Sequence, residues 1–244
     1  MENPRQWLAL MIGNSHHHWG YFEKDQLIRT WQTDHFLAQP IAVIPSGFSP
    51  DIPLYLASVV PNQTEFFLSY PHLQPLELQD IPLKNLYPTL GIDRALAVLG
   101  ASEIYGFPCL VIDGGTALTL TGVNGDRALV GGAILSGLGL QFRTLGTQTA
   151  ALPTLDLPQT LPPRWANNTS DAIASGILYF LLAGLSSFIK DWLDQFPKSQ
   201  IILTGGDGKI LFNYLHTLDL EHAFSLTHDP HLIFWGMRSL TIQI

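Results

Sequence analysis

The sequence predicts an α/β fold made of two related domains with a cleft between them. The order strand–strand–strand–helix occurs twice in the 244 residues, and each time the first strand is apolar and ends in a glycine turn, Gly13-Asn14-Ser15 or Gly114-Gly115-Thr116. With 46% hydrophobic and 13% charged residues, the chain is long enough to bury a substantial core. We place the two domains at residues 1–107 and 108–244.

In the first domain, short apolar runs predict five strands, at residues 7–12, 19–22, 26–33, 54–60 and 65–69. A polar stretch with several prolines, residues 70–88, leads into a helix that begins near Ile92. Apolar residues at helical spacing, such as Leu96 and Leu99, support that helix.

In the second domain, apolar runs predict strands at 109–112, 116–121 and 128–134, and Asn124-Gly125 is a strong hairpin turn between the last two. The remaining elements follow in this order: a helix over 137–149, a proline-rich connector over 152–164, a long helix, a strand at 200–203, a glycine loop at 204–208, a helix, a strand near Phe224 and a helical segment over 232–240.

The long helix contains an uncharged run, residues 172–189, that approaches the length of a membrane span. Apolar residues recur along one side of the run, while small and polar residues such as Ser175, Gly176 and Ser186 follow the other side. This pattern favours a long helix buried in a soluble protein or in a dimer over a membrane helix.

The charge balance and the cysteine count exclude several classes of protein. Twelve basic and twenty acidic residues give a net charge of −8, which is poorly suited to general nucleic-acid binding. The single cysteine, Cys109, excludes an intramolecular disulfide and a cysteine-rich zinc site. The first residues lack the apolar core and the cleavage site of a signal peptide, so we expect a cytoplasmic protein.

The second glycine turn has the chemistry of an anion site. Asp113 ends an apolar strand, Gly114 and Gly115 allow a ligand to approach the backbone, and Thr116 adds a hydroxyl donor. Successive N–H groups in such a turn bind anions, and the neighbouring aspartate can hold a cation. An ordinary hairpin is the alternative reading. Two such turns and a late glycine loop form the layout of the actin-like, sugar-kinase and Hsp70 (ASKHA) superfamily, whose domains are RNase H-like.

A third motif, the sequence YPTLGIDRALAVLGA at residues 87–101, places Asp93 and Arg94 at a helix entrance. An aspartate there is most often a cap on free N–H groups. Together with the arginine, however, it brings a proton acceptor and a cation into one small volume. A kinase that acts on an alcohol needs both.

These motifs, with GGAILSGLGLQFRTL and NTSDAIASG, resemble type III pantothenate kinases, most closely the cyanobacterial members, over nearly the whole chain. The resemblance implies two actin-like domains and a homodimer that phosphorylates pantothenate with ATP in the first step of coenzyme A synthesis. It also implies a need for magnesium and for a monovalent cation, potassium or ammonium.

The resemblance implies a role for individual residues as well. Asp93 matches the proton acceptor, and Asp113 matches the ligand of the monovalent cation. The residues that match pantothenate contacts are Tyr87, Gly91, Ile92, Arg94 and Thr169. The residues expected at ATP are Gly13, Asn14, Ser15, His16, Gly115, Thr116, Gly205 and Gly206.

The first turn departs from the family pattern. The family usually has an aspartate two residues before the glycine, where this chain has Met11, which cannot ligate magnesium usefully. Either ATP, water and Asp113 hold the metal, as we expect, or phosphoryl transfer is impaired. His16, His17 and His18 follow the turn and are read as structural, as an ATP contact through His16, or as a metal site. If they form a strand, His16 and His18 share a face.

Three functions remain open from the sequence. A pantothenate kinase is the expected one. A non-catalytic relative that acts as a regulatory or accessory binding protein is the alternative, and Met11 is the feature that favours it. A kinase for another small alcohol is the third.

Overall fold

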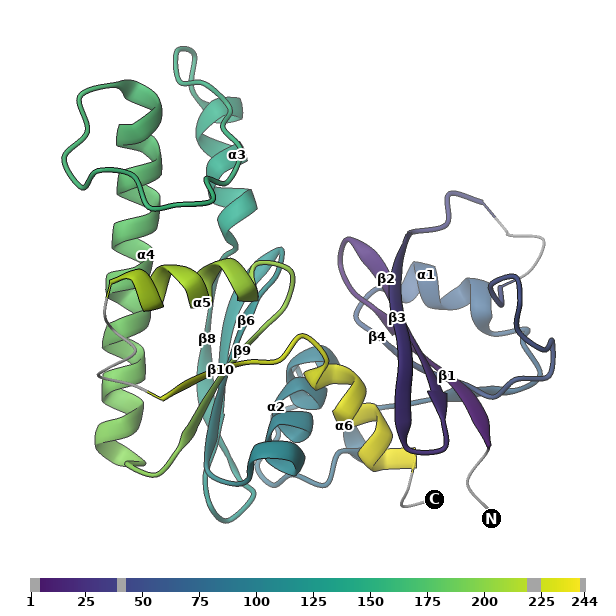
Figure 1. Ribbon diagram of the computed structural model, residues 1–244. Helices are drawn as coiled ribbons and strands as arrows, with labels where there is room; N and C mark the ends of the chain where they lie inside the picture. Colours follow the sequence, from purple (N-terminus) through teal and green to yellow (C-terminus); the bar gives the residue numbers. More distant parts are fainter. Residues whose placement is uncertain (1–4, 39–42, 219–224, 242–244) are drawn as a thin grey trace. The chain divides into compact units, whose positions relative to one another are not determined.

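The computed structural model describes residues 5–38, 43–218 and 225–241 (Figure 1). Its contacts divide the chain into two compact units, residues 1–104 with 231–244, and residues 105–230. Each unit contains one five-stranded sheet in which parallel and antiparallel pairs are mixed, together with helices. The predicted α/β class is therefore confirmed.

The sheet of the first unit has the strand order β3-β2-β1-β4-β5. Its strands are β1 (Gln6–Ile12), β2 (His16–Glu23), β3 (Gln26–Asp34), β4 (Leu54–Ser58) and β5 (Leu73–Pro75). The first three form an antiparallel meander, and β4 and β5 extend the sheet in parallel with β1. Three short helices also belong to this unit: α1 (Pro61–Thr64), η1 (Glu65–Phe67) and η2 (Leu78–Asp80).

The expected strand at residues 65–69 is wrong, because this segment continues the helical turn that begins at Pro61. Proline fits the first helical position, where its missing N–H costs nothing. Phe67 still serves the core, since it packs with Leu8, Leu10 and Ile12 of β1 in one buried cluster.

Helix α6 (Leu232–Thr241) packs in the first unit, although it comes last in the sequence. It crosses α2 (Ile92–Tyr105) closely, since a Cβ on Gly100 would lie 1.9 Å from the carbonyl oxygen of Leu232, and a Cβ on Gly236 would lie 2.1 Å from that of Leu96. The contacts thus group residues 231–244 with the first unit, whereas the expected domain division at 107/108 places them in the second.

The sheet of the second unit has the strand order β10-β9-β6-β7-β8. Its strands are β6 (Cys109–Gly114), β7 (Ala117–Val123), β8 (Leu129–Ser136), β9 (Gln200–Thr204) and β10 (Leu226–His228), and its helices are α3 (Leu138–Gln148), α4 (Thr169–Gln195) and α5 (Gly208–Thr217). The predicted strand near Phe224 falls on residues outside the described part of the chain.

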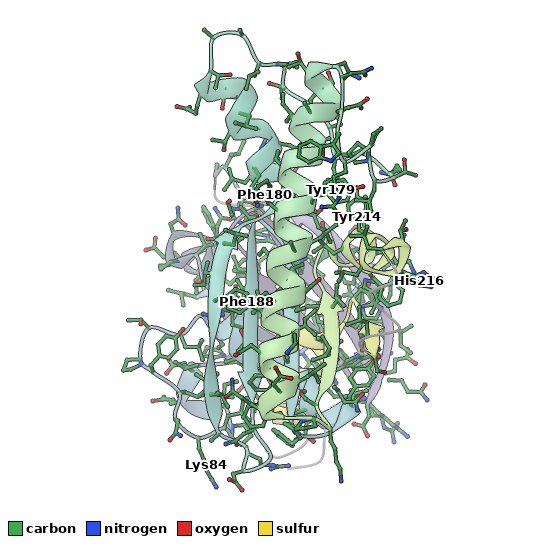
Figure 2. The ribbon with its side chains drawn as sticks, turned by 90° about the vertical axis from the view of Figure 1, so that its left-hand side faces the viewer. Lys84, Tyr179, Phe180, Phe188, Tyr214 and His216 are labelled. Atoms are coloured by element: carbon green, nitrogen blue, oxygen red, sulfur yellow. The ribbon has the colours of Figure 1, made fainter. Side chains whose placement is uncertain are left out.

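Helix α4 is long and apolar enough to cross a membrane by length and composition alone. In the structure one side of α4 packs in the core of the second unit, where residues such as Leu178, Leu182 and Ile189 are completely buried. The ring of Trp192 lies over β7, where a Cβ on Gly122 would be only 2.5 Å from it. Figure 2 shows the opposite side of α4, with Phe180 and Phe188 facing outward.

Candidate active site

The first glycine turn joins β1 to β2 in a tight hairpin. The N–H of Gly13 donates to the carbonyl oxygen of His16 at 3.0 Å, and Asn14 and Ser15 are exposed at the tip. Met11, two residues earlier, is 1% exposed and belongs to the buried core. Its side chain therefore contributes to packing and offers no ligand to a cation at the turn.

The histidines after the turn alternate as expected for a strand. His17 is completely buried, and burial lowers its pKa to about 4, with the nearby His35 as a second cause. His16 and His18 lie on the other face, with ring centroids 6.4 Å apart. Among the described residues, no three His, Cys, Asp or Glu side chains form a group that could hold a metal ion.

Asp93 lies in the first turn of α2 and is partly buried. Its Oδ1 accepts a hydrogen bond from the backbone N–H of Arg94 at 2.8 Å. Burial raises the pKa of Asp93, and the hydrogen bond and charge of Arg94 oppose the rise. Gly91 leaves the space that this carboxylate occupies, because a Cβ there would lie 2.4 Å from Oδ1.

The same segment fixes the other expected pantothenate contacts of the first unit. Nη1 of Arg94 donates to the hydroxyl of Tyr87 at 2.9 Å, and the N–H of Leu90 donates to the carbonyl oxygen of Tyr87. Arg94 is 7% exposed, whereas the Tyr87 side chain is half-exposed. Ile92 is buried where α2 begins. The segment therefore brings Tyr87, Gly91, Ile92, Asp93 and Arg94 together.

The second turn is joined to the glycine loop that follows β9. Strands β6 and β9 are parallel neighbours, and Asp113 pairs with Thr204. Gly205 follows with φ of +83°, and a Cβ there would lie 2.2 Å from Oδ1 of Asp113. Glycine is thus required at 205 for its backbone angle and for its contact with the carboxylate. The sheet brings together Asp113, Gly115, Thr116, Gly205 and Gly206.

Sequence reasoning missed a third segment at this turn, the start of α3. The N–H of Gly137 donates to the carbonyl oxygen of Thr116 at 3.0 Å. Asp207 connects the pieces, because its own N–H donates to the carbonyl oxygen of Gly114 at 2.7 Å and the N–H of Gly139 faces its carboxylate, where it opposes the rise in pKa that burial causes. Asp207 is the N-cap residue of α5, yet its side chain makes no cap bond to α5.

Thr169 is the first residue of α4 and is exposed. The N-cap Asn168 accepts a hydrogen bond from the N–H of Asp171 at 2.9 Å, which fixes the start of the helix. Thr169 belongs to the second unit, whereas Tyr87 and Arg94 belong to the first. Its expected contact with pantothenate stays a prediction.

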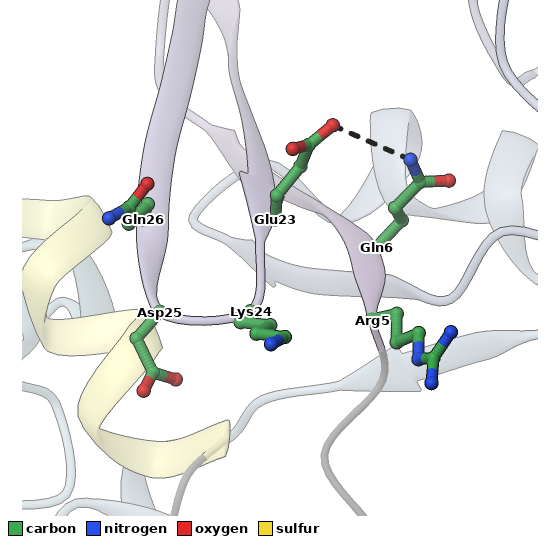
Figure 3. Close-up of a pocket in the computed structure, with 6 residues that line it drawn as sticks. All are labelled: Arg5, Gln6, Glu23, Lys24, Asp25 and Gln26. Carbon is green, nitrogen blue, oxygen red and sulfur yellow. Dashed lines mark hydrogen bonds between the residues drawn. The ribbon is translucent and has the colours of Figure 1, made fainter.

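A cavity of about 690 Å³ lies at the other end of β1 from Gly13, around the turn between β2 and β3 (Figure 3). Side chains of both charges line it, among them Arg5, Glu23 and Asp25. None of the expected site residues lines this cavity, so we give it no part in the candidate site.

Comparison with known proteins shows the family of the chain. The model of the type III pantothenate kinase family matches residues 7–191. A type III pantothenate kinase from Synechocystis is 50% identical, with 98% of this chain and 93% of that protein covered. The corresponding Nostoc protein is 45% identical, with coverage of 98% and 95%.

Solved structures show the same fold at lower sequence identity. A Baf family protein from Campylobacter jejuni has a TM-score of 0.66 at 22% identity, with 97% of this chain and 98% of that chain covered. MreB 5 of Spiroplasma citri has a TM-score of 0.52 at 11% identity, with coverage of 98% and 97%. These likenesses confirm the actin-like α/β fold. The family match and the near full-length relatives show that this chain belongs to the type III pantothenate kinase family.

Proposed function

We propose that the protein transfers the terminal phosphoryl group of ATP to the primary hydroxyl of pantothenate and so forms 4′-phosphopantothenate, the first step of coenzyme A biosynthesis. The observation that carries this proposal is the Asp93 carboxylate, held in the first turn of α2 beside the bonded pair of Arg94 and Tyr87. The family of the chain supplies the reaction class.

Asp93 is the general base in this proposal. A carboxylate accepts a hydroxyl proton better as its pKa rises towards the working pH, and burial raises the pKa of Asp93. The guanidinium of Arg94 supplies positive charge for the carboxylate of pantothenate. The Tyr87 hydroxyl, which Arg94 orients, would contact the same substrate together with Gly91 and Ile92.

The glycine turns hold the ATP phosphates. The proposed contacts are Gly13, Asn14, Ser15 and His16 in the first turn, Gly115 and Thr116 in the second turn, and Gly205 and Gly206 for the adenosine. Magnesium neutralises the phosphate charge when it is bound with ATP. Asp113 fits a monovalent cation, potassium or ammonium, because its carboxylate offers hard oxygen donors beside backbone carbonyls of the turn.

We also propose that the working form is a homodimer formed through the outer face of α4. Phe180 and Phe188 of α4 are exposed there (Figure 2), and Leu135 of β8 and Leu140 of α3 are exposed on neighbouring elements. A shallow groove between α3 and α4 crosses this face and is lined by Leu145, Gly176 and Ile177 among others. A second copy of the chain would cover it and would bring Thr169 to the pantothenate pocket at the dimer interface.

Phe180→Glu tests the dimer, because it places a charge where the side chain is 84% exposed in the single chain. Sedimentation should show a monomer for this variant and a dimer for the wild-type protein. The control is Leu68→Glu, an equally apolar surface residue of the first unit, which should leave the dimer intact. A monomeric wild-type protein would contradict the proposal.

The reaction is tested by phosphorylation of labelled pantothenate with ATP and magnesium, with and without potassium. Product that depends on potassium supports the kinase and shows that the enzyme tolerates Met11. Absence of product from folded dimer would instead favour the non-catalytic binding protein, which Met11 makes the second candidate. The proposed partners are thus ATP, pantothenate and a second copy, with no nucleic acid and no membrane, in the cytoplasm.

A further inference from the structure

We propose that His35 is a positioning residue for the first glycine turn, which it holds so that the Asn14 N–H faces the ATP phosphates. This inference rests on the proposed function, because it assigns a task to a residue beside the proposed ATP site. His35 lies just after β3, outside the run of histidines that follows the turn.

The contact that carries the inference joins Nε2 of His35 to the carbonyl oxygen of Gly13 at 2.9 Å. A carbonyl oxygen can only accept, so Nε2 carries the hydrogen and His35 is the donor. His35 is partly buried, and Asn14 and Ser15 beside the contact are exposed. The side chain of His35 therefore touches the backbone of the turn and leaves its tip open.

Because the peptide bond is planar, this contact also fixes the direction of the Asn14 N–H. The carbonyl of Gly13 and the N–H of Asn14 belong to one planar trans unit and point in opposite directions. The N–H of Asn14 consequently points away from His35. The N–H of Gly13 is already used by the carbonyl oxygen of His16. The hydrogen bond from His35 to the Gly13 carbonyl oxygen thus orients the Asn14 N–H, which is the next donor along the turn.

The residue after His35, Phe36, is held by a buried amide, that of Gln63. Gln63 accepts from the N–H of Phe36 at 2.9 Å and donates to the carbonyl oxygen of Phe36 at 3.0 Å. These two bonds fix which atom of the amide is oxygen. The same oxygen lies 3.1 Å from Nε2 of His17, so that nitrogen also carries a hydrogen. The residue next to His35 is therefore clamped to α1, where Gln63 lies.

The surroundings of the turn agree with a positioning role. The rings of His17 and His35 lie 5.1 Å apart, and Nε2 of His18 lies 3.4 Å from the position of a Cβ on Gly13. Two imidazoles therefore lie beside Gly13, that of His18 from β2 and that of His35 from the residue just after β3. The simpler reading is that His35 only stabilises the hairpin, and the two readings predict different kinetics.

The test compares two substitutions of similar length. His35→Gln places an amide N–H near the position of Nε2, whereas His35→Met keeps the length and removes the donor. We expect His35→Met to raise KM for ATP about fivefold, the usual worth of one hydrogen bond, and to change kcat and KM for pantothenate by less than about twofold. His35→Gln should restore most of the ATP affinity. His72→Ala, on the opposite edge of the sheet, is the control and should match the wild type.

Three results would overturn the inference. The first is an unchanged KM for ATP in His35→Met. The second is an equal rise in KM for ATP in His35→Met and His35→Gln. The third is a change in kcat and in both KM values together that scales with a fall in melting temperature. The rise in melting temperature that magnesium-ATP causes in the absence of pantothenate tests this inference separately from the proposed function. If ATP stabilises the wild type but no phosphopantothenate forms, the proposed reaction fails, and the difference between the Met and Gln variants in ATP stabilisation still decides the role of His35.

Discussion

The guanidinium of Arg94 donates from Nη1 to the hydroxyl of Tyr87, seven residues earlier in the chain, at a distance of 2.9 Å. The arginine is 7% exposed and the tyrosine is 40% exposed, so a buried cation orients a side chain that remains accessible. This bond joins two ends of the segment that carries Asp93. The positions of these side chains are therefore fixed before the substrate binds.

Tyr87→Phe removes the acceptor of that bond and keeps the ring. We expect KM for pantothenate to rise about three- to tenfold, the range of one typical hydrogen bond, with KM for ATP unchanged. Steady-state kinetics in both substrates measure this. An equal change in the two KM values would show that the bond supports the fold of the unit and not the pantothenate pocket.

Gly91→Ala should displace the Asp93 carboxylate, because the new Cβ would lie 2.4 Å from Oδ1. We expect kcat to fall by at least about tenfold, since a small misplacement of a reacting group has a large kinetic cost. Gly125→Ala is the matched control, because nothing lies within 4 Å of a Cβ there. Wild-type turnover in Gly91→Ala would argue against Asp93 as the base.

Asp207→Ala removes the carboxylate that faces the Gly139 N–H and so weakens the attachment of α3 to the second turn, which then depends on the bond from Gly137 to Thr116. We expect KM for ATP to rise about three- to tenfold. Asp207→Asn should have a smaller effect, because its amide oxygen can still accept from Gly139. Asp126→Ala, at an exposed hairpin, is the control. Similar ATP kinetics for Asp207→Ala and the wild type would separate α3 from nucleotide binding.

His17 should make the protein sensitive to acid. Its pKa is about 4 in the folded state and 6.5 in the unfolded state, so the unfolded state binds the proton more tightly. Its contribution is fully present above pH 6.5 and is lost as the pH falls towards 4. The loss amounts to roughly 3 kcal/mol of unfolding free energy. Urea denaturation of His17→Phe, which cannot titrate at this position, should show a weaker pH dependence than the wild type; equal slopes would disprove the assignment.

The sequence was most informative where one local pattern decided the structure. The glycine turns after apolar strands, the Asn124-Gly125 hairpin and the entrance of α2 at Ile92 all lie where they were expected. The expected strand at 65–69 failed because Pro61 begins a helical turn that outweighs the aromatic residues after it. The packing of α6 in the first unit depends on glycines 136 residues apart in sequence, Gly100 and Gly236, and no local signal reveals such a pair.

The site shows the same division. Tyr87, Gly91, Asp93 and Arg94 lie within eight residues, so their grouping could be read from the motif. His35 and Asp207 could not be assigned in the same way, because each acts on backbone atoms that are distant in sequence, at Gly13 and Gly139. Asp207 lies in the predicted glycine loop, which is a weak indication of a functional role, whereas His35 lies in no motif that the sequence reveals.

The most direct test of the account compares Asp93→Asn with the wild type in the formation of 4′-phosphopantothenate at saturating ATP and pantothenate. The asparagine keeps the shape of the side chain and its acceptor for the Arg94 N–H, but it cannot take the hydroxyl proton. We expect kcat to fall about 10²- to 10⁴-fold, while stabilisation by magnesium-ATP remains at the wild-type level. A kcat within about twofold of the wild type would contradict the assignment of Asp93 as the general base of this kinase.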